Sequence, residues 1–133
     1  MAREVAREAA LESGIAPGVL VLHLDAGLYT ANTRPTVERV LALARASSPT
    51  PRAVVLESGA QRGVTSTVLD GLGDLDRQLA GIGCTLLLAR VPRATADRAM
   101  ASPWFAALVA DGRLLPSVDA AVDAVQTLPA TPR

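Results

Sequence analysis

The residues best able to take part in chemistry lie in a short polar stretch between two apolar segments. It brings Gly63 and the hydroxyl residues Thr65, Ser66 and Thr67 to the start of a predicted helix. Free backbone N–H groups and the positive dipole end of that helix would face any anion placed there. A phosphate on Ser66 or Thr67 would gain from the same field. The alternative is that Thr65 or Ser66 only caps the helix, as hydroxyl residues commonly do.

The other candidate side chains form no recognisable catalytic pattern. His23, the only histidine, lies inside an apolar run without a carboxylate or cysteine partner at a familiar spacing, so we interpret it as a core or edge residue. Asp70 and Asp74 share a helix face that could bind a cation, but a solvated face is the interpretation we prefer. Arg90 and Arg93 could pair with a phosphate or with surface carboxylates. We therefore expect no catalytic residue and no metal site.

Composition excludes several classes of function. The 133 residues carry 13 basic and 13 acidic side chains, and every basic one is arginine. Balanced charge gives no general attraction to nucleic acid, and 2% aromatic residues cannot form a platform for stacking bases. The absence of lysine excludes P-loop and Schiff-base lysine chemistry. With one histidine and one cysteine, Cys84, neither an intrachain disulfide nor a zinc cluster can form.

Hydropathy predicts a cytoplasmic domain with no direct membrane insertion. No apolar run approaches the roughly 20 residues that span a bilayer. The charged start of the chain lacks the apolar stretch of a signal peptide. Cys84 begins a predicted buried strand, where it is expected to act as a small hydrophobe.

Apolar runs alternate with amphipathic segments, which predicts a mainly parallel sheet covered by helices. Strands are expected at 19–24, 53–57 and 84–90, with short ones at 28–30 and 114–115. Helices are expected from a cap at Asn32 or Thr33, with Pro35 in the first turn, to about 45, and then over 65–80, 96–100, 103–109 and 117–125.

The length is that of one domain. Residues 1–16 are expected to be a lead-in, with charges at helical spacing that favour a short helix over residues 1–13. The folded domain is expected over 17–126, and the Pro-rich segment 127–133 is expected to be a mobile tail. Ligands of such sheets bind outside the carboxyl ends of the strands, where the segments 25–32, 58–67 and 91–95 begin.

The order of these segments resembles the STAS domain, which is shared by sulfate transporters and anti-sigma factor antagonists. Residues 17–32, PGVLVLHLDAGLYTAN, are similar to a pattern of SulP-type permeases: a proline–glycine, an apolar strand, and an aromatic residue followed by Ala-Asn. Segments 72–91 and 115–122 match the family's third strand and its last strand-to-helix junction. The resemblance covers 17–125 and is closest to the cytoplasmic C-terminal domain of SulP-family permeases. It implies an α/β STAS fold, a mixed, mainly parallel sheet of four to five strands with about four to five helices.

The resemblance also implies a site. In the family, the loop before the second helix usually reads Asp-Ser-Ser/Thr-Gly, and antagonists are phosphorylated there. The matching residues are Thr65, Ser66, Thr67 and Val68, with Thr67 at the phosphoacceptor position. The missing aspartate and the β-branched Val68 favour the transporter branch. The implied interaction loop comprises Gly63, Thr65, Ser66 and Thr67, and a candidate ligand or partner surface comprises Asp25, Tyr29, Asn32 and Arg90.

Three hypotheses follow. The first is a non-enzymatic regulatory and protein-interaction domain of a SulP-type sulfate or anion transporter. Such a domain would contact the transmembrane domain at the cytoplasmic face of the inner membrane and bind a nucleotide or anion at this loop, with no other cofactor. The alternative is a freestanding anti-sigma factor antagonist that releases an anti-sigma kinase when Thr67 or Ser66 is phosphorylated. The third is a small hydrolase or transferase that uses His23.

Overall fold

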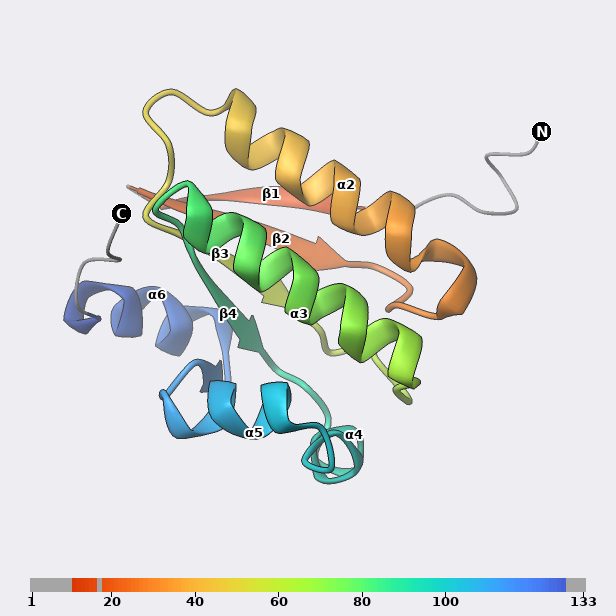
Figure 1. The fold of residues 1–133 in the computed structure, drawn as a ribbon. Helices are drawn as coiled ribbons and strands as arrows, with labels where there is room; N and C mark the ends of the chain where they lie inside the picture. The colour runs from red at the N-terminus through yellow and green to blue at the C-terminus, as the bar shows by residue number, and fades with distance from the viewer. Residues whose placement is uncertain (1–10, 17, 129–133) are drawn as a thin grey trace.

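A computed structural model of the chain describes residues 11–16 and 18–128 (Figure 1). That part of the chain folds into five strands and five helices in a single α/β unit. In chain order they are β1 (Leu11–Ala16), β2 (Val19–Leu24), α2 (Thr30–Ala46), β3 (Ala53–Glu57), α3 (Ser66–Gly81), β4 (Thr85–Ala89), α4 (Arg93–Ala99), α5 (Pro103–Ala110), β5 (Leu114–Leu115) and α6 (Val118–Thr127).

The five strands form one sheet in the order β1-β2-β3-β4-β5. Strand β1 is antiparallel to β2, and each of the other neighbouring pairs is parallel. All residues of β3 are buried, as expected for a central strand whose apolar run is continuous and covered on both faces. The predicted fold class, a mixed and mainly parallel sheet with covering helices, is confirmed.

Helices cover the two faces of the sheet unequally. Helices α2 and α3 run side by side across one face, as Figure 1 shows, and enclose the larger core, which includes Leu22, Val40 and Leu79. On the opposite face α6 packs through Ala121 and Val125 against a smaller core. Leu, Val and Ala fill most of both cores, so the scarcity of aromatic residues does not prevent dense packing.

The close approach of α2 and α3 depends on a glycine. A Cβ at Gly71 of α3 would overlap the Cγ2 methyl of Thr33 on α2, because the two helices touch at this point. Thr33 is itself buried, with its hydroxyl donating to the Tyr29 carbonyl at 2.6 Å. Gly71 therefore sets the spacing between the two helices.

The N-terminal prediction was wrong where it can be compared with the structure. Residues 11–16 had been assigned to the lead-in, with a short helix expected as far as residue 13, but Leu11–Ala16 form β1 and pair with β2. Pairing with β2, a tertiary contact, determines the conformation of these six residues. The rest of the predicted helix, residues 1–10, lies outside the described residues.

The start of α2 was also mispredicted. Residues 28–30 form no strand, and the helix begins at Thr30 with Tyr29 as its N-cap. Asn32 occupies the third helical position instead of the cap, and its Oδ1 accepts a hydrogen bond from Tyr29 N at 2.8 Å. This is the reciprocal contact that a capping box uses. Pro35 consequently lies inside the helix instead of in its first turn.

Later elements differ only at their ends. Helix α4 begins at Arg93, and α6 continues to Thr127, two residues beyond its predicted end. The proposed mobile tail thus overlaps the last helix, and its residues 129–133 lie outside the described part. Within residues 11–16 and 18–128, no helix is long and apolar enough to cross a membrane.

Candidate functional site

Two loops at the carboxyl edge of the sheet are joined by one buried side chain, that of Gln61. Its Oε1 accepts from Leu28 N at 2.6 Å, and its Nε2 donates to Leu28 O at 2.7 Å and to Gly63 O at 2.7 Å. Gln61 is 7% exposed. The β2–α2 loop is therefore fixed against the β3–α3 loop, which carries the predicted hydroxyl residues.

Helix α4 supports the same loop through the side chain of Thr95. Thr95 is buried, and its hydroxyl lies 2.9 Å from both Gln61 O and Arg62 O. Since a hydroxyl has one proton, these two carbonyls share it. Sequence analysis missed Gln61 and Thr95, because a single glutamine in a loop and a single threonine in a helix carry no spacing pattern.

The predicted interaction loop leads into α3 as expected. Thr65 is the N-cap, and its Oγ1 accepts from Val68 N at 3.2 Å, so the capping alternative is correct for Thr65. Ser66 and Thr67 occupy the first turn of α3 and are exposed. Gly63 is half-buried and has open space where a Cβ would lie. Two hydroxyls thus remain accessible at a helix N-terminus whose cap is already satisfied.

The β2–α2 loop contributes some, but not all, of its predicted surface residues. Asp25 is exposed, and Tyr29 is 49% exposed at the start of α2. Thr30 of the same turn places its hydroxyl oxygen 3.5 Å from that of Thr65. Asn32, however, is 2% exposed, and its Nδ2 donates to Gly27 O at 3.1 Å. The prediction that Asn32 lies on the ligand surface is wrong: its amide shapes the turn before α2.

Arg90 lies apart from these residues, in a contact that sequence analysis did not find. Its Nη1 donates to Glu57 Oε2 at 2.9 Å, so of the two predicted partners a carboxylate is the one present. The other oxygen, Glu57 Oε1, is 3.6 Å from His23 Nδ1. His23 thus has a carboxylate partner that the spacing along the sequence did not reveal. Strand register brings these residues together, since His23 on β2 pairs with Glu57 on β3.

The hydrolase hypothesis needs a nucleophile next to His23. Within the described residues, no hydroxyl or thiol is hydrogen-bonded to His23, and the hydroxyl of Ser58 donates to Leu56 O. Cys84 is fully buried, and desolvation raises the pKa of its thiol to about 12. A protonated, buried thiol is a poor nucleophile, which agrees with the interpretation of Cys84 as a small hydrophobe.

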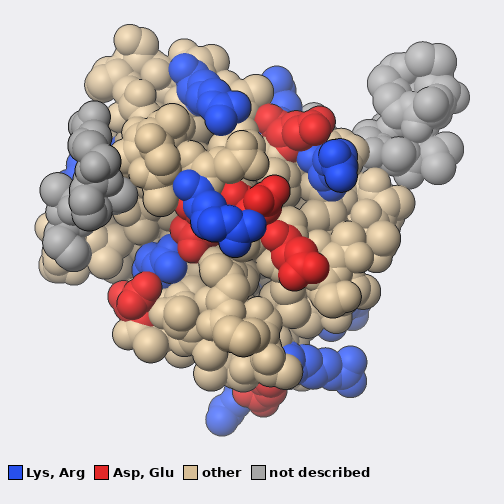
Figure 2. Space-filling model, viewed as in Figure 1, with Lys and Arg blue, Asp and Glu red and all other residues tan. Residues whose placement is uncertain are grey.

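An open groove of about 680 Å³ runs between α2 and α3. Thr30 and Thr67 lie at its lining, and acidic and basic side chains mix along it, as the face in Figure 2 shows. Asp74 forms an ion pair with Arg77 at 2.8 Å, and both side chains are more than half exposed. No group of three acidic, histidine or cysteine residues in the described chain could hold a metal ion. The solvated interpretation of the acidic helix face is thus the better one for Asp74.

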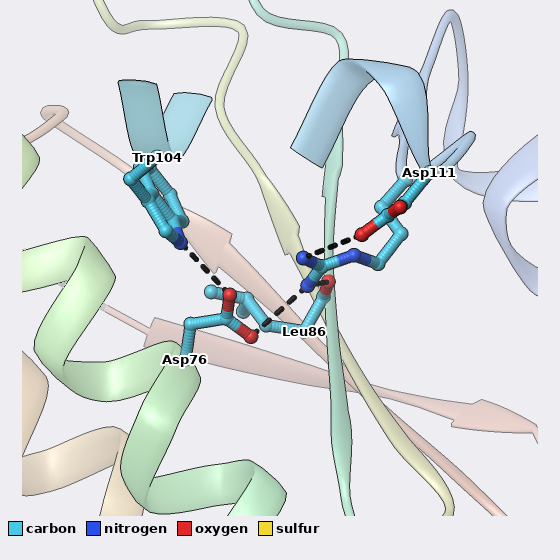
Figure 3. A network of polar contacts seen from close by, with 5 residues as sticks. Asp76, Leu86, Trp104 and Asp111 are labelled. Atoms are coloured by element: carbon cyan, nitrogen blue, oxygen red, sulfur yellow. Dashed lines mark hydrogen bonds and ion pairs between the residues drawn. The ribbon is translucent and has the colours of Figure 1, made fainter. Parts of the chain in front are cut away.

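A second polar network fastens α5 and the β5 region to α3 (Figure 3). Asp76 accepts from Trp104 Nε1 at 2.8 Å and from Arg113 Nη1 at 3.0 Å. Arg113 also donates to Leu86 O at 3.0 Å and lies 3.4 Å from Asp111. These contacts hold α3, α5 and the segment before β5 in place.

Comparison with known proteins places the fold. No protein-family model and no curated protein matches the chain. Among solved structures, the murine Slc26a9 anion transporter in the inward-facing state matches with a TM-score of 0.74 and 20% identity over 84% of this chain. A sulfate transporter family protein from Wolinella succinogenes matches with a TM-score of 0.70 and 16% identity over 86% of this chain and 89% of its own length. The chain has the fold of a STAS domain.

The chain matches only a small portion of each SLC26A9 transporter. A second structure of SLC26A9 matches with a TM-score of 0.67 and 21% identity over 83% of this chain. The match covers 18% and 20% of the two SLC26A9 chains, so this chain corresponds in fold to a small part of those transporters. The fold resemblance stated from the sequence is therefore confirmed, and the functional roles that it implies remain predictions.

Proposed function

We propose that this STAS domain is a non-enzymatic regulatory and protein-interaction module of a SulP-type sulfate or anion transporter. The observation that supports it most is the structural match of over four-fifths of the chain to one portion of two SLC26A9 structures. On this proposal the partner is the transmembrane domain of a permease, and the module works on the cytoplasmic side of the membrane. On the same proposal, the transmembrane partner and not this domain binds and carries the transported anion.

The proposed ligand surface is the pair of loops that Gln61 joins. Ser66 and Thr67 present exposed hydroxyls at the start of α3, while Asp25 and Tyr29 are exposed on the neighbouring loop. A nucleotide or inorganic anion bound there would meet the positive end of the α3 dipole. Because both loops are anchored by buried hydrogen bonds, a ligand would find them already ordered.

Amide chemical-shift titrations with GDP, ATP and sulfate test the ligand. We expect saturable shifts confined to residues 25–31 and 63–67, and the double variant Ser66→Ala with Thr67→Ala weakens them. Shifts confined to residues elsewhere would exclude this placement. Regulation is tested by anion uptake through a permease that carries this domain, compared with the same permease lacking it. Equal uptake and no binding between the separate parts would overturn the proposed role.

The alternative function is that of an anti-sigma factor antagonist. The observation that supports it is the exposure of Thr67 in the first turn of α3, where a kinase could reach the hydroxyl. Phosphate added there would place charge within a protein interface and weaken it. Incubation with a cognate kinase, followed by intact-mass measurement, tests this function. No added phosphate, together with unchanged partner binding by Thr67→Glu, would exclude the alternative.

A further inference from the structure

A group of charged side chains lies on the sheet face opposite to α2 and α3. His23 lies on the same face of β2 as Val19 and Val21, and Glu57 lies on the same face of β3 as Ala53 and Val55. These four apolar residues belong to the core beneath α6. Glu57 pairs in register with Ala89 of β4, and Arg90 follows directly. We call His23, Glu57 and Arg90 the Glu57 cluster.

The carboxylate at the centre of this cluster is held in a close-fitting site. The Glu57 side chain is 10% exposed, and its Oε2 accepts from Arg90 Nη1 at 2.9 Å and from Gly59 N at 3.2 Å. A Cβ on residue 59 would lie 2.7 Å from Oε2 and 3.3 Å from Arg90 Cζ, so a larger residue there would displace the carboxylate from its present position. Burying a carboxylate is costly unless it is paired, so these contacts fix the arginine as well as the acid.

Arg90 is held in an unusual backbone conformation. Its φ of 64° lies in the left-handed region that residues other than glycine rarely adopt. Its backbone N–H donates to Leu115 O at 3.0 Å, which holds the residue in place. Non-glycine residues with positive φ concentrate at functional sites, where the surrounding structure maintains the strain.

The hydrogen bond to Glu57 orients the Arg90 guanidinium but involves one of its three nitrogen atoms. The Arg90 side chain is 61% exposed, and in the described chain Nη1 is the atom that makes its hydrogen bond. The edge formed by Nε and Nη2 has no hydrogen-bond partner among those residues. Such an edge matches two oxygens of a phosphate or a carboxylate.

Charged residues of both signs occur in the segments next to the cluster, and exposed Asp25 follows β2 two residues after His23. Arg62 and Arg93 are exposed and have no ion-pair partner in the described chain. Thr95 of α4 contacts the Arg62 carbonyl, and α4 begins at Arg93, so both arginines belong to the segments that surround this edge. Asp97 is exposed on α4, and Glu12 of β1 pairs in register with His23, on the side of β2 away from β4.

We propose that the Glu57 cluster binds a phosphate group, either inorganic or carried as a monoester by a small molecule. Arg90 is the binding residue, through its Nε–Nη2 edge, and Glu57 is the positioning residue that orients it. His23 lies against the other carboxylate oxygen, and Arg62 and Arg93 belong to the segments that follow β3 and β4. This site is separate from the loop at the start of α3 and does not depend on the proposed function.

Titration of the full chain with orthophosphate, at an ionic strength kept constant with sodium chloride, tests the site. We expect saturable shifts of the Arg90 Nε–H signal and of the amides of residues 57–59 and 90. Arg90→Asn keeps a residue that tolerates positive φ and weakens binding by about tenfold or more. Glu57→Gln weakens it less, and the matched control Arg98→Gln, on exposed α4, leaves it unchanged. Glycerol 2-phosphate in a second titration shows whether a monoester binds in place of the free ion.

The outcomes separate this inference from the proposed function. Absence of saturable shifts with both phosphates, or equal affinity in the Arg90→Asn protein, would overturn the inference. Saturable shifts at residues 63–67 alone would do the same while supporting the loop site. Shifts at the Glu57 cluster with none at residues 63–67 for GDP, ATP and sulfate would support this site and count against the ligand placement proposed above.

Discussion

The side-chain amide of Gln61 pairs with the backbone of Leu28 as one strand pairs with another. Oε1 accepts from Leu28 N at 2.6 Å while Nε2 donates to Leu28 O at 2.7 Å. The two loops that precede α2 and α3 are thus joined at the carboxyl edge of the sheet. Because Gln61 is buried, shortening its side chain would leave buried backbone groups of Leu28 without their partners.

Gln61→Ala is therefore expected to lower the free energy of unfolding by about 2–4 kcal/mol, since a buried backbone N–H and C=O each lose a partner. Urea denaturation measures the loss. Gln126→Ala, on an exposed position of α6, is the matched control and is expected to change stability by less than about 0.5 kcal/mol. Faster hydrogen exchange at the Leu28 amide in Gln61→Ala, with unchanged exchange in β3, would locate the effect. Equal stability of the two variants would contradict this role for Gln61.

Gly71→Ala is expected to destabilise the domain, although alanine normally favours helices. The new Cβ would overlap the Thr33 methyl, and forced overlap in a packed contact costs about 1–3 kcal/mol. Thr33→Ser removes that methyl and is expected to restore part of the loss. Gly81→Ala, at the end of the same helix with open space around the Cβ position, is the control. Thermal unfolding that ranks Gly71→Ala at or above the stability of Gly81→Ala would show that the helices are not in this contact.

Apolar periodicity was sufficient to predict the sheet and most of its helices. The runs at 19–24 and 53–57 are strands with the predicted bounds, because four-fifths of their residues or more are apolar and the sheet buries both faces. Strand β1 was missed, since Glu12, Ser13 and Gly14 interrupt its apolar residues and its pairing with β2 is a tertiary contact. Edge strands receive less of their definition from local sequence than central ones do.

The candidate site was predictable only where it depends on local sequence. A hydroxyl residue before an amphipathic run identified Thr65 as a cap candidate, because capping involves residues three apart. The Glu57 cluster joins residues of two strands, His23 on β2 and Glu57 on β3, with Arg90, which directly follows β4, and its geometry depends on strand register, which one sequence does not contain. Asn32 was placed on the surface although its contacts are local, because the predicted helix start at Asn32 or Thr33 was too late to show that its amide bonds Tyr29 N and Gly27 O in the turn before α2.

Asp76→Asn tests the network between α3 and α5. Trp104 and Arg113 both donate to this carboxylate, and the side chains of Asp76 and Arg113 are 16% and 14% exposed. Removing the charge leaves the guanidinium of Arg113 less well compensated, and a loss of about 1–3 kcal/mol is expected in urea denaturation. Asp74→Asn removes a more exposed ion pair with Arg77 on the same helix and is expected to cost under about 1 kcal/mol. A loss as small for Asp76→Asn would mean that the network contributes little to holding α5.

Cys84 gives the stability of the domain a defined dependence on high pH. Burial raises the pKa of its thiol from 9.0 to about 12, so the folded chain keeps a proton that the unfolded chain releases. The stabilisation from this group is complete below pH 9 and is lost as the pH rises from 9 toward 12. Denaturation of the wild type and of Cys84→Ala between pH 8 and pH 10.5 measures it, and we expect the wild type to lose more stability over this interval.

In the native wild type the thiol is also expected to react with iodoacetamide far more slowly than in urea, because the thiolate is the reactive form. Parallel pH curves for the two proteins, or rapid native alkylation, would show that the thiol ionises as it does in water.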